Sequence, residues 1–197
     1  MTIRRGARIQ RFTGVLLVKP PASLRFEALS PFGQPFLLLT ISGGMLSAFN
    51  VAENLALSGP VNERTTGRWL GVPLEAEDVV GLLIGRVTPD RGLREAEVLP
   101  PDADGPSLRL AGDHRRVRLW MDFETGEVHK AEIGGRATLV VIYARNPGAP
   151  VPRDIHATAG PDFEAEVHYQ EPAIATGISE ERFVLQLPAG ANVQRFH

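Results

Sequence analysis

The sequence predicts a single, mostly β domain over residues 1–197, with one short helical segment at about residues 62–85. Runs rich in Val, Leu, Ile, Phe and Thr alternate with Gly, Pro, Asp and Asn along most of the chain. This pattern is typical of short β-strands joined by tight turns. Residues 62–85 instead carry apolar side chains at helical spacing. Hydrophobic residues make up 43% of the chain and charged residues 22%, ordinary values for a globular protein.

The expected strands form two series, one on each side of the helical segment. They are Ile9–Val18, Leu24–Leu29, Phe36–Ile41, Met45–Asn50 and Asn54–Ser58, then Arg94–Leu99, Ser107–Ala111, Val117–Phe123, Val128–Gly134, Ala137–Arg145, Arg153–Ala159, Glu164–Glu171 and Arg182–Leu187. Apolar and charged residues alternate in Leu24–Ala28, so one face of this strand should be exposed to water. Phe36–Leu39 is apolar on both faces, so this strand should be covered on both sides.

The helical segment supplies the cover that such a strand needs. Two short helices, Glu63–Leu70 and Glu75–Ile84, are expected on either side of Gly71-Val72-Pro73. Acidic residues begin the second helix, where the helix dipole favours negative charge, and Gly85 follows it as a C-terminal cap. Apolar residues nearly encircle this helix, so it should be buried on most sides or lie over an apolar cavity.

The composition excludes several classes of function. The chain has no cysteine, which excludes disulfides, thiolate metal sites and Cys nucleophiles. Its formal net charge of −2 argues against general nucleic-acid binding. No apolar run approaches the roughly 20 residues that span a bilayer. Met1–Ile9 is basic and no apolar segment follows, so no signal peptide is predicted. The protein is therefore cytoplasmic, or the sequence begins after a removed export segment.

The residues also give little support to catalysis. The histidines, which show no spacing typical of metal ligands, are His114, His129, His156, His168 and His197. A hydrolase would need a cleft that joins His156 or His168 to a carboxylate such as Asp154 or Asp162, and a sheet surface brings such residues together by chance. No nucleophile elbow or phosphate-binding glycine motif occurs. We predict no catalytic residue, no metal site and no cofactor, and expect that the protein is not an enzyme.

Three groups of short segments, in chain order, carry a family resemblance. The first group is Phe12-Thr13-Gly14 followed by Leu24–Phe36, which contains the loop Leu29-Ser30-Pro31-Phe32-Gly33. The second runs from Trp69–Leu74 through Leu82–Gly85. The third is Leu119–Asp122 through Thr125-Gly126, then Phe183-Val184-Leu185 with Pro188-Ala189-Gly190. Together they resemble the bacterial lipoprotein carrier and receptor superfamily, LolA and LolB, and the LolB receptor most. The resemblance implies a strongly curved antiparallel half-barrel sheet, with short helices over its concave face and the last group as its closing strand.

The resemblance also implies a function. The chain would bind lipoprotein acyl chains in an apolar cavity and deliver them to the outer membrane, without chemistry. Its partners would be these acyl chains, a periplasmic lipoprotein carrier and the inner leaflet of the outer membrane. The implied location is the periplasmic face of the outer membrane, lipid-anchored if an N-terminal signal and Cys precede this sequence, and the soluble periplasm otherwise.

Two sets of residues follow from this resemblance. Pro31, Phe32 and Gly33 form the expected membrane-insertion loop, and the alternative is a turn whose Phe folds onto the core. The expected cavity and lid residues are Leu37, Leu39, Leu46, Phe49, Trp69, Leu70, Leu74, Val79, Leu82, Leu83, Leu119 and Met121. For these the alternative is ordinary core packing. The same fold could also serve an envelope protein that binds another hydrophobic ligand, or a non-catalytic structural domain with a filled core.

Two basic clusters need no ligand to explain them. The N-terminal cluster, Arg4, Arg5, Arg8 and Arg11, could touch anionic lipid, but a solvated tail running into an edge strand is the commoner explanation. The second cluster, Arg115, Arg116 and Arg118, should lie on a solvent-exposed face.

Overall fold

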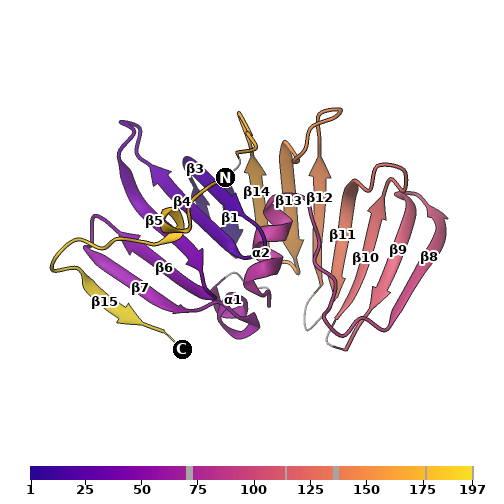
Figure 1. Cartoon of the computed structure of the whole chain (residues 1–197), viewed down its shortest axis with the longest axis horizontal. Helices are drawn as coiled ribbons and strands as arrows, with labels where there is room; N and C mark the ends of the chain where they lie inside the picture. Colours follow the sequence, from indigo (N-terminus) through magenta and orange to yellow (C-terminus); the bar gives the residue numbers. More distant parts are fainter. Residues whose placement is uncertain (70–72, 114, 135–137, 176, 197) are drawn as a thin grey trace.

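A computed structural model describes residues 1–69, 73–113, 115–134, 138–175 and 177–196 as two β-sheets with two short α-helices between them (Figure 1). The large sheet has the order β2 (Arg8–Arg11), β1 (Thr2–Arg5), β14 (Phe163–His168), β13 (Asp154–Ala159), β12 (Leu139–Ala144), β11 (Val128–Gly134), β10 (Arg116–Met121), β9 (Gly105–Ala111) and β8 (Glu95–Asp102). The small sheet has the order β15 (Asn192–Arg195), β7 (Leu55–Pro60), β6 (Met45–Asn50), β5 (Pro35–Ser42), β4 (Ser23–Leu29) and β3 (Thr13–Lys19). The predicted class, mostly β with two short helices, is confirmed.

The two sheets meet along one extended run of chain, residues 8–19, which the sequence predicts as a single strand. Its first part, β2, pairs with β1 in the large sheet, and its second part, β3, pairs with β4 in the small sheet. Phe12 separates them, and its backbone N–H donates to the carbonyl of Met1 at 2.8 Å. The hydrogen-bonded ladder changes partner at this point. The structure therefore has two open sheets where the sequence predicts one strongly curved sheet.

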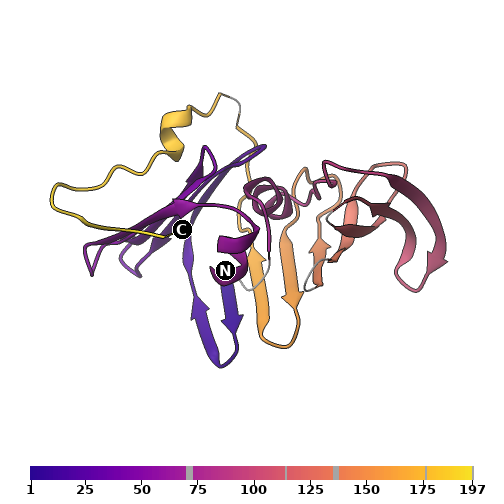
Figure 2. The ribbon, with the colours of Figure 1, turned by 90° about the horizontal axis from the view of Figure 1, so that it is seen from below.

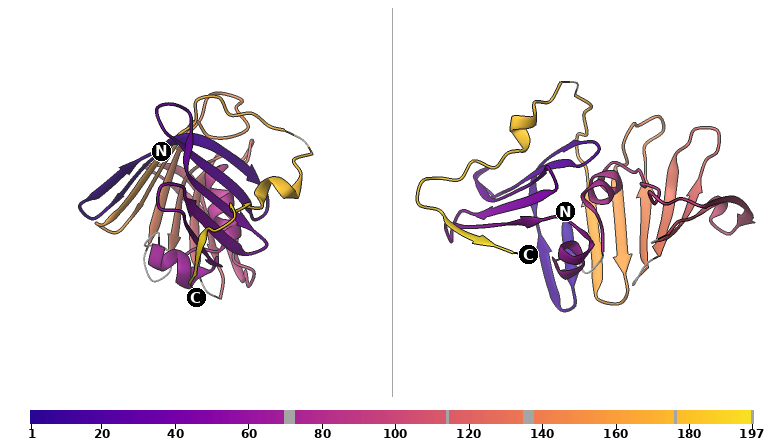
Figure 3. Two further views of the ribbon diagram at one scale, coloured as in Figure 1. Left: turned by 90° about the vertical axis from the view of Figure 1, so that its left-hand side faces the viewer. Right: turned by 60° about the horizontal axis from the view of Figure 1, so that its bottom comes forward.

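Both ends of the chain differ from the prediction. The N-terminal residues form β1, which pairs with β14 on one side and with β2 on the other (Figure 3). Residues 182–187 do not form the predicted closing strand. A 3-10 helix, η1 (Glu180–Phe183), begins after Ser179, and Phe183 is fully buried. The last strand of the small sheet is β15, parallel to β7.

Helix α2 (Ala76–Leu83) lies between the two sheets, while α1 (Glu63–Trp69) precedes it (Figures 1 and 2). Val79 packs against the apolar cores of both sheets. Leu82 packs on the large-sheet core, and Val80 and Leu83 belong to the small-sheet core. This position explains why apolar residues encircle the helix. As predicted, Gly85 follows the helix with a positive φ of 75°.

The small sheet is covered on both faces, as the apolar strand at Phe36–Leu39 predicts. Helix α2 packs on β3 and β4 from one side, which we call the inner face. The C-terminal segment covers the other side, the outer face, where η1 packs on β4 and β5 (Figure 2). Arg25, on the outer face of β4, donates to the carbonyl of Arg182 at 3.2 Å. The charged face of β4 is therefore partly covered by chain and not fully open to water.

Candidate ligand-binding site

The inner face of the small sheet is apolar and only partly covered by α2. Cross-strand register places Phe26 opposite Leu39, and Leu24 opposite Ile41. Residues paired in this way point to the same face of a sheet. Leu24 and Ile41 are buried, but other members of this surface are only partly buried. The partly buried members on the strands and their first turn are Leu16, Val18, Ala22, Phe26, Leu39 and Leu46. An apolar surface of this kind suits a hydrophobic ligand.

The inner face of the large sheet is more completely filled. Leu119 on β10 is 7% exposed, and Val141 on β12 is fully buried. Leu74, just before α2, is buried in the same cluster, while Leu82 and Met121 pack against it partly exposed. The apolar inner face of the large sheet is therefore more fully buried, and that of the small sheet is less fully covered.

The structure places most of the predicted cavity and lid residues on the inner faces of the two sheets and on or just before α2. Leu37, Leu39 and Leu46 lie on the inner face of the small sheet, and Leu119 and Met121 on that of the large sheet. Leu74, Val79, Leu82 and Leu83 come from α2 and the residues before it. Trp69 ends α1, and Leu70 lies outside the described residues.

Phe49 does not belong to this set. It pairs with Leu38 on β5 and Ala56 on β7, which lie on the outer face. Leu46 and Phe49 are three positions apart on one strand, and successive side chains of a strand point to opposite faces. They therefore cannot share the inner face, and the prediction for Phe49 was wrong for this reason.

The β4–β5 turn presents Phe32 to solvent. Gly33 N–H donates to the carbonyl of Ser30 at 2.9 Å, and Ser30 N–H donates to that of Gln34 at 2.8 Å. Pro31 occupies the second position of this turn, where its fixed φ is favourable, and Gly33 follows with a φ of 76°. Phe32 at the tip is 91% exposed. Its ring does not fold onto the core, which was the alternative left open by the sequence.

Three further phenylalanines connect the inner face to this end of the small sheet. The ring of Phe12 lies 6.2 Å from that of Phe26 in an edge-to-face arrangement and stacks on Phe36 at 6.5 Å. Phe26 packs against the inner core, whereas Phe36 is 39% exposed. Sequence reasoning did not identify these contacts because Phe12 lies at the junction of the two sheets, and a strand pattern alone does not reveal that junction.

Polar groups gather at the C-terminal end of α2. Tyr169 Oη donates to the carbonyl of Leu83 at 2.9 Å, and Arg145 Nη2 donates to that of Gly85 at 3.1 Å. Tyr143 Oη and Arg145 Nε are buried without a hydrogen-bond partner among the described residues. Burial raises the pKa of both Tyr143 and Tyr169 well above the usual range, so both hydroxyls stay protonated at neutral pH. The hydrogen bonds from Tyr169 and Arg145 hold the end of α2 against the large sheet.

The outer face of the large sheet carries two His–carboxylate pairs. His156 Nε2 lies 3.0 Å from Glu164 Oε1, and His168 Nδ1 lies 2.5 Å from Asp154 Oδ1. A hollow of about 330 Å³ is lined by both histidines, Asp154 and residues of β1 and β14. The side chains of His156, Glu166 and His168 project from the outer face, because they alternate along their strands with Ile155 and Val167, which pack into the inner core.

Comparison with known proteins identifies the fold. A solved structure of a LolA superfamily protein from Nitrosomonas europaea matches 93% of this chain and 87% of its own length, with a TM-score of 0.58 and 16% sequence identity. The chain therefore shares the fold of that protein. No protein-family model matches the sequence, and no curated protein is similar to it. Within the described residues, no helix is both long enough and apolar enough to cross a membrane.

Proposed function

We propose that this chain binds the acyl chains of lipoproteins between its two sheets and delivers them to the outer membrane, with no bond made or broken. The observation that carries this proposal is the partly exposed apolar surface on the inner face of the small sheet, beside α2. Core side chains in a filled interior are usually fully buried and closely packed. An apolar face that its own helix covers only in part supports a hydrophobic ligand as its second cover.

An acyl chain is a suitable occupant because it needs apolar area and few polar contacts. Its burial contributes roughly 0.8 kcal/mol per CH₂ group, so one chain can bind without a specific donor. In this proposal the inner faces of the two open sheets act as the walls of the site, and residues 62–85 act as a lid. Leu39 and Leu46 line one wall, Leu119 lines the other, and Leu82 and Leu83 belong to the lid.

Delivery would begin at Phe32. An exposed aromatic ring gains roughly 1.5–3 kcal/mol when it leaves water for an apolar environment such as the acyl region of a bilayer. Phe26, Phe12 and Phe36 supply an apolar route from the inner face toward this end of the sheet. The membrane then accepts the cargo because it offers a larger apolar volume. The proposed location is the periplasmic side of the outer membrane, with a periplasmic carrier as the donor of cargo.

Native mass spectrometry with a synthetic triacylated lipopeptide, alone and then with phospholipid liposomes, tests this proposal. We expect a one-to-one complex that loses its cargo to liposomes. Leu39→Trp should weaken binding because it fills the inner face. Leu38→Trp is the matched control, because Leu38 is adjacent to Leu39 on β5 but points to the outer face, and the overpacking cost, about 1–3 kcal/mol, is similar.

Phe32→Glu separates delivery from binding. This variant should bind the lipopeptide as well as the wild-type chain does, but transfer it to liposomes more slowly. Val98→Glu is the control, because Val98 is also exposed, at 63%, but lies on the far edge strand β8 of the large sheet. Unchanged transfer by Phe32→Glu contradicts the role of the loop. Binding of a different lipid would favour another hydrophobic ligand, and no lipid-dependent mass shift would favour a structural domain.

A further inference from the structure

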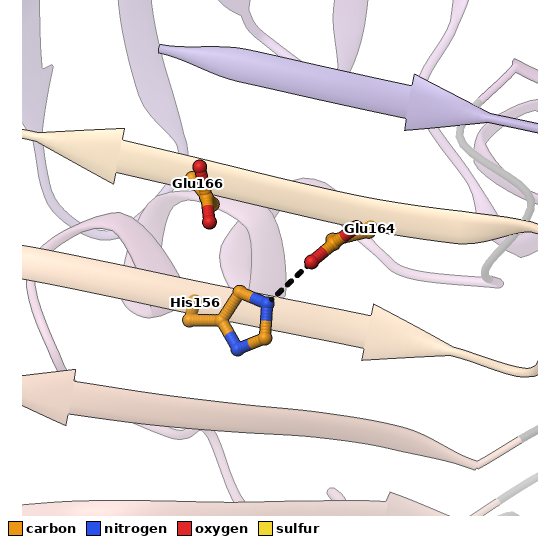
Figure 4. Close-up of side chains that lie close together, drawn as sticks. All are labelled: His156, Glu164 and Glu166. Carbon is orange, nitrogen blue, oxygen red and sulfur yellow. Dashed lines mark hydrogen bonds and ion pairs between the residues drawn. The ribbon is translucent and has the colours of Figure 1, made fainter. Parts of the chain in front are cut away.

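We infer that the outer face of the large sheet holds a binding site for a divalent transition-metal ion of the zinc type, with His156, Glu164 and Glu166 as ligands. This site lies across the sheet from the proposed acyl-chain surface and does not depend on it. One donor atom from each of the three residues lies within 4.8 Å of the other two (Figure 4). The sequence did not predict this site because its members come from two strands.

Strand register brings the three side chains together. His156 on β13 is directly opposite Glu166 on β14, and Glu164 lies two residues earlier on β14. Side chains two apart on a strand share a face. All three therefore project from the outer face of the same strand pair, as Figure 4 shows.

The donor set suits zinc chemistry. Zinc binds imidazole nitrogen and carboxylate oxygen at about 2.0–2.2 Å, which places tetrahedral ligands about 3.4 Å apart. His156 and Glu164 already meet at 3.0 Å, so the remaining adjustment falls to Glu166, whose side chain is solvent-exposed. Glutamate carboxylates are ionised at neutral pH, as metal ligands must be.

The surroundings leave room for the ion and its water. The hollow of about 330 Å³ is lined by His156, Glu166 and His168 together with Met1 and Thr2, and Glu164 lies beside it. His168, which also lines the hollow, turns its Nδ1 toward Asp154. Arg4 opposes the ion, because its guanidinium lies 3.1 Å from Glu164 Oε2. Glu164 can keep that contact on one oxygen and offer the other to the metal.

Isothermal titration calorimetry of the full chain with zinc chloride, after removal of any histidine tag, tests the site. We expect one zinc ion per chain. His156→Ala and Glu166→Gln should each weaken binding by more than about tenfold. Arg4→Gln should strengthen it several-fold by removing the opposing charge. His129→Gln is the matched control, because His129 lies on β11 of the same sheet and contacts the carbonyl of Asp104 instead.

A second measurement guards against variants that fail to fold. Zinc that binds the native state raises the unfolding temperature by mass action, so the wild-type chain and His129→Gln should gain stability with zinc while His156→Ala should not. No heat of binding at millimolar zinc would overturn the inference. So would weak binding at several sites that is equal in all variants.

Discussion

At the scale of single residues, Arg115 differs most from its prediction. The sequence places it in a solvent-exposed basic cluster, but its side chain is only 14% exposed and that of its partner Asp78 only 4%. Arg115 Nη1 donates to Asp78 Oδ2 at 2.6 Å, and Nη2 donates to the carbonyl of Thr88 at 2.7 Å. Asp78 also accepts from the backbone of Glu75 at the start of α2. The pair therefore ties the start of this helix to the β9–β10 connection.

Arg115→Ala should lower the free energy of unfolding by about 3–5 kcal/mol, because it leaves the Asp78 carboxylate buried without its cation. Urea unfolding followed by tryptophan fluorescence measures this loss. The control is Arg91→Ala. The Arg91 side chain is 86% exposed and pairs with Glu77, which lies on α2 next to Asp78. An exposed pair contributes about 0–1 kcal/mol. Equal losses in the two variants would contradict the importance of burial.

The burial of Trp120 is also explained only by its contacts with neighbouring side chains. It lies on the outer face of the large sheet, opposite Ser107 and Lys130, and is nevertheless 2% exposed. Arg118 and Lys130 each lie 4.2 Å from its ring centre, a cation–π arrangement. Its Nε1 donates to Asp102 Oδ1 at 2.9 Å. Asp102, at the end of β8, thereby joins the tip of the β8–β9 hairpin to β10.

The hydrogen bond from Trp120 holds the pKa of Asp102 below its usual range. A carboxylate with a lowered folded-state pKa adds stability above its unfolded pKa, near 4, and that stability is lost as the pH falls further. The urea midpoint of the wild-type chain should therefore fall more steeply below about pH 4 than that of Asp102→Asn. Parallel profiles for the two proteins would show that Asp102 makes no such contribution.

At the scale of elements, the C-terminal end of α2 is held by two hydrogen bonds to its carbonyls, from Tyr169 and Arg145. Tyr169→Phe removes one of them and should lower stability by about 0.5–1.5 kcal/mol. It should also speed amide hydrogen exchange in residues 79–85, since a loosened helix end opens more often. If α2 acts as a lid, the same variant should take up an acyl-chain probe faster.

Tyr143→Phe is the control for this prediction. Its hydroxyl is buried and has no hydrogen-bond partner among the described residues. Its removal should leave stability unchanged or raise it slightly, because no hydrogen bond is lost and a desolvated group disappears. If both variants lost the same amount of stability, the loss in Tyr169→Phe could not be attributed to its hydrogen bond with α2.

At the scale of the whole molecule, the C-terminal segment completes the small sheet. It covers the outer face through η1 and then adds β15 beside β7 (Figure 1). Lys19 contributes a further link, since its Nζ donates to the carbonyl of Ile178 at 3.0 Å. The small sheet is therefore held between two segments that are far apart in sequence, α2 and residues 177–196.

Phe183→Ala should lower the free energy of unfolding by about 3–5 kcal/mol, since a fully buried aromatic side chain leaves a cavity when truncated. Val184→Ala is the matched neighbour, because Val184 is 55% exposed. A surface substitution of this kind usually changes stability by about 0.5 kcal/mol or less. Denaturant unfolding distinguishes the two. A small effect of Phe183→Ala would show that η1 does not secure the outer face.

Much of the local structure was predictable. The observed bounds of β6 and β11 agree with the predicted strands residue for residue, and α2 differs from its prediction by one residue at each end. Turn residues and hydrophobic period are local signals that a sequence displays directly. The exposed position of Phe32 was one of two alternatives, and the 91% exposure of its side chain at the tip of the turn distinguishes them.

The sequence by itself determined the β class, the helical segment and most of the apolar residues that face it. These features follow from the hydrophobic periodicity of residues that are close together in the chain. Only the tertiary structure decided which strands pair across the Phe12 junction, which face Phe49 occupies and where Phe183 packs. It also decided that His156 and Glu166 stand opposite each other. These features depend on register and on contacts between distant segments, and a shift of one residue exchanges the two faces of a strand.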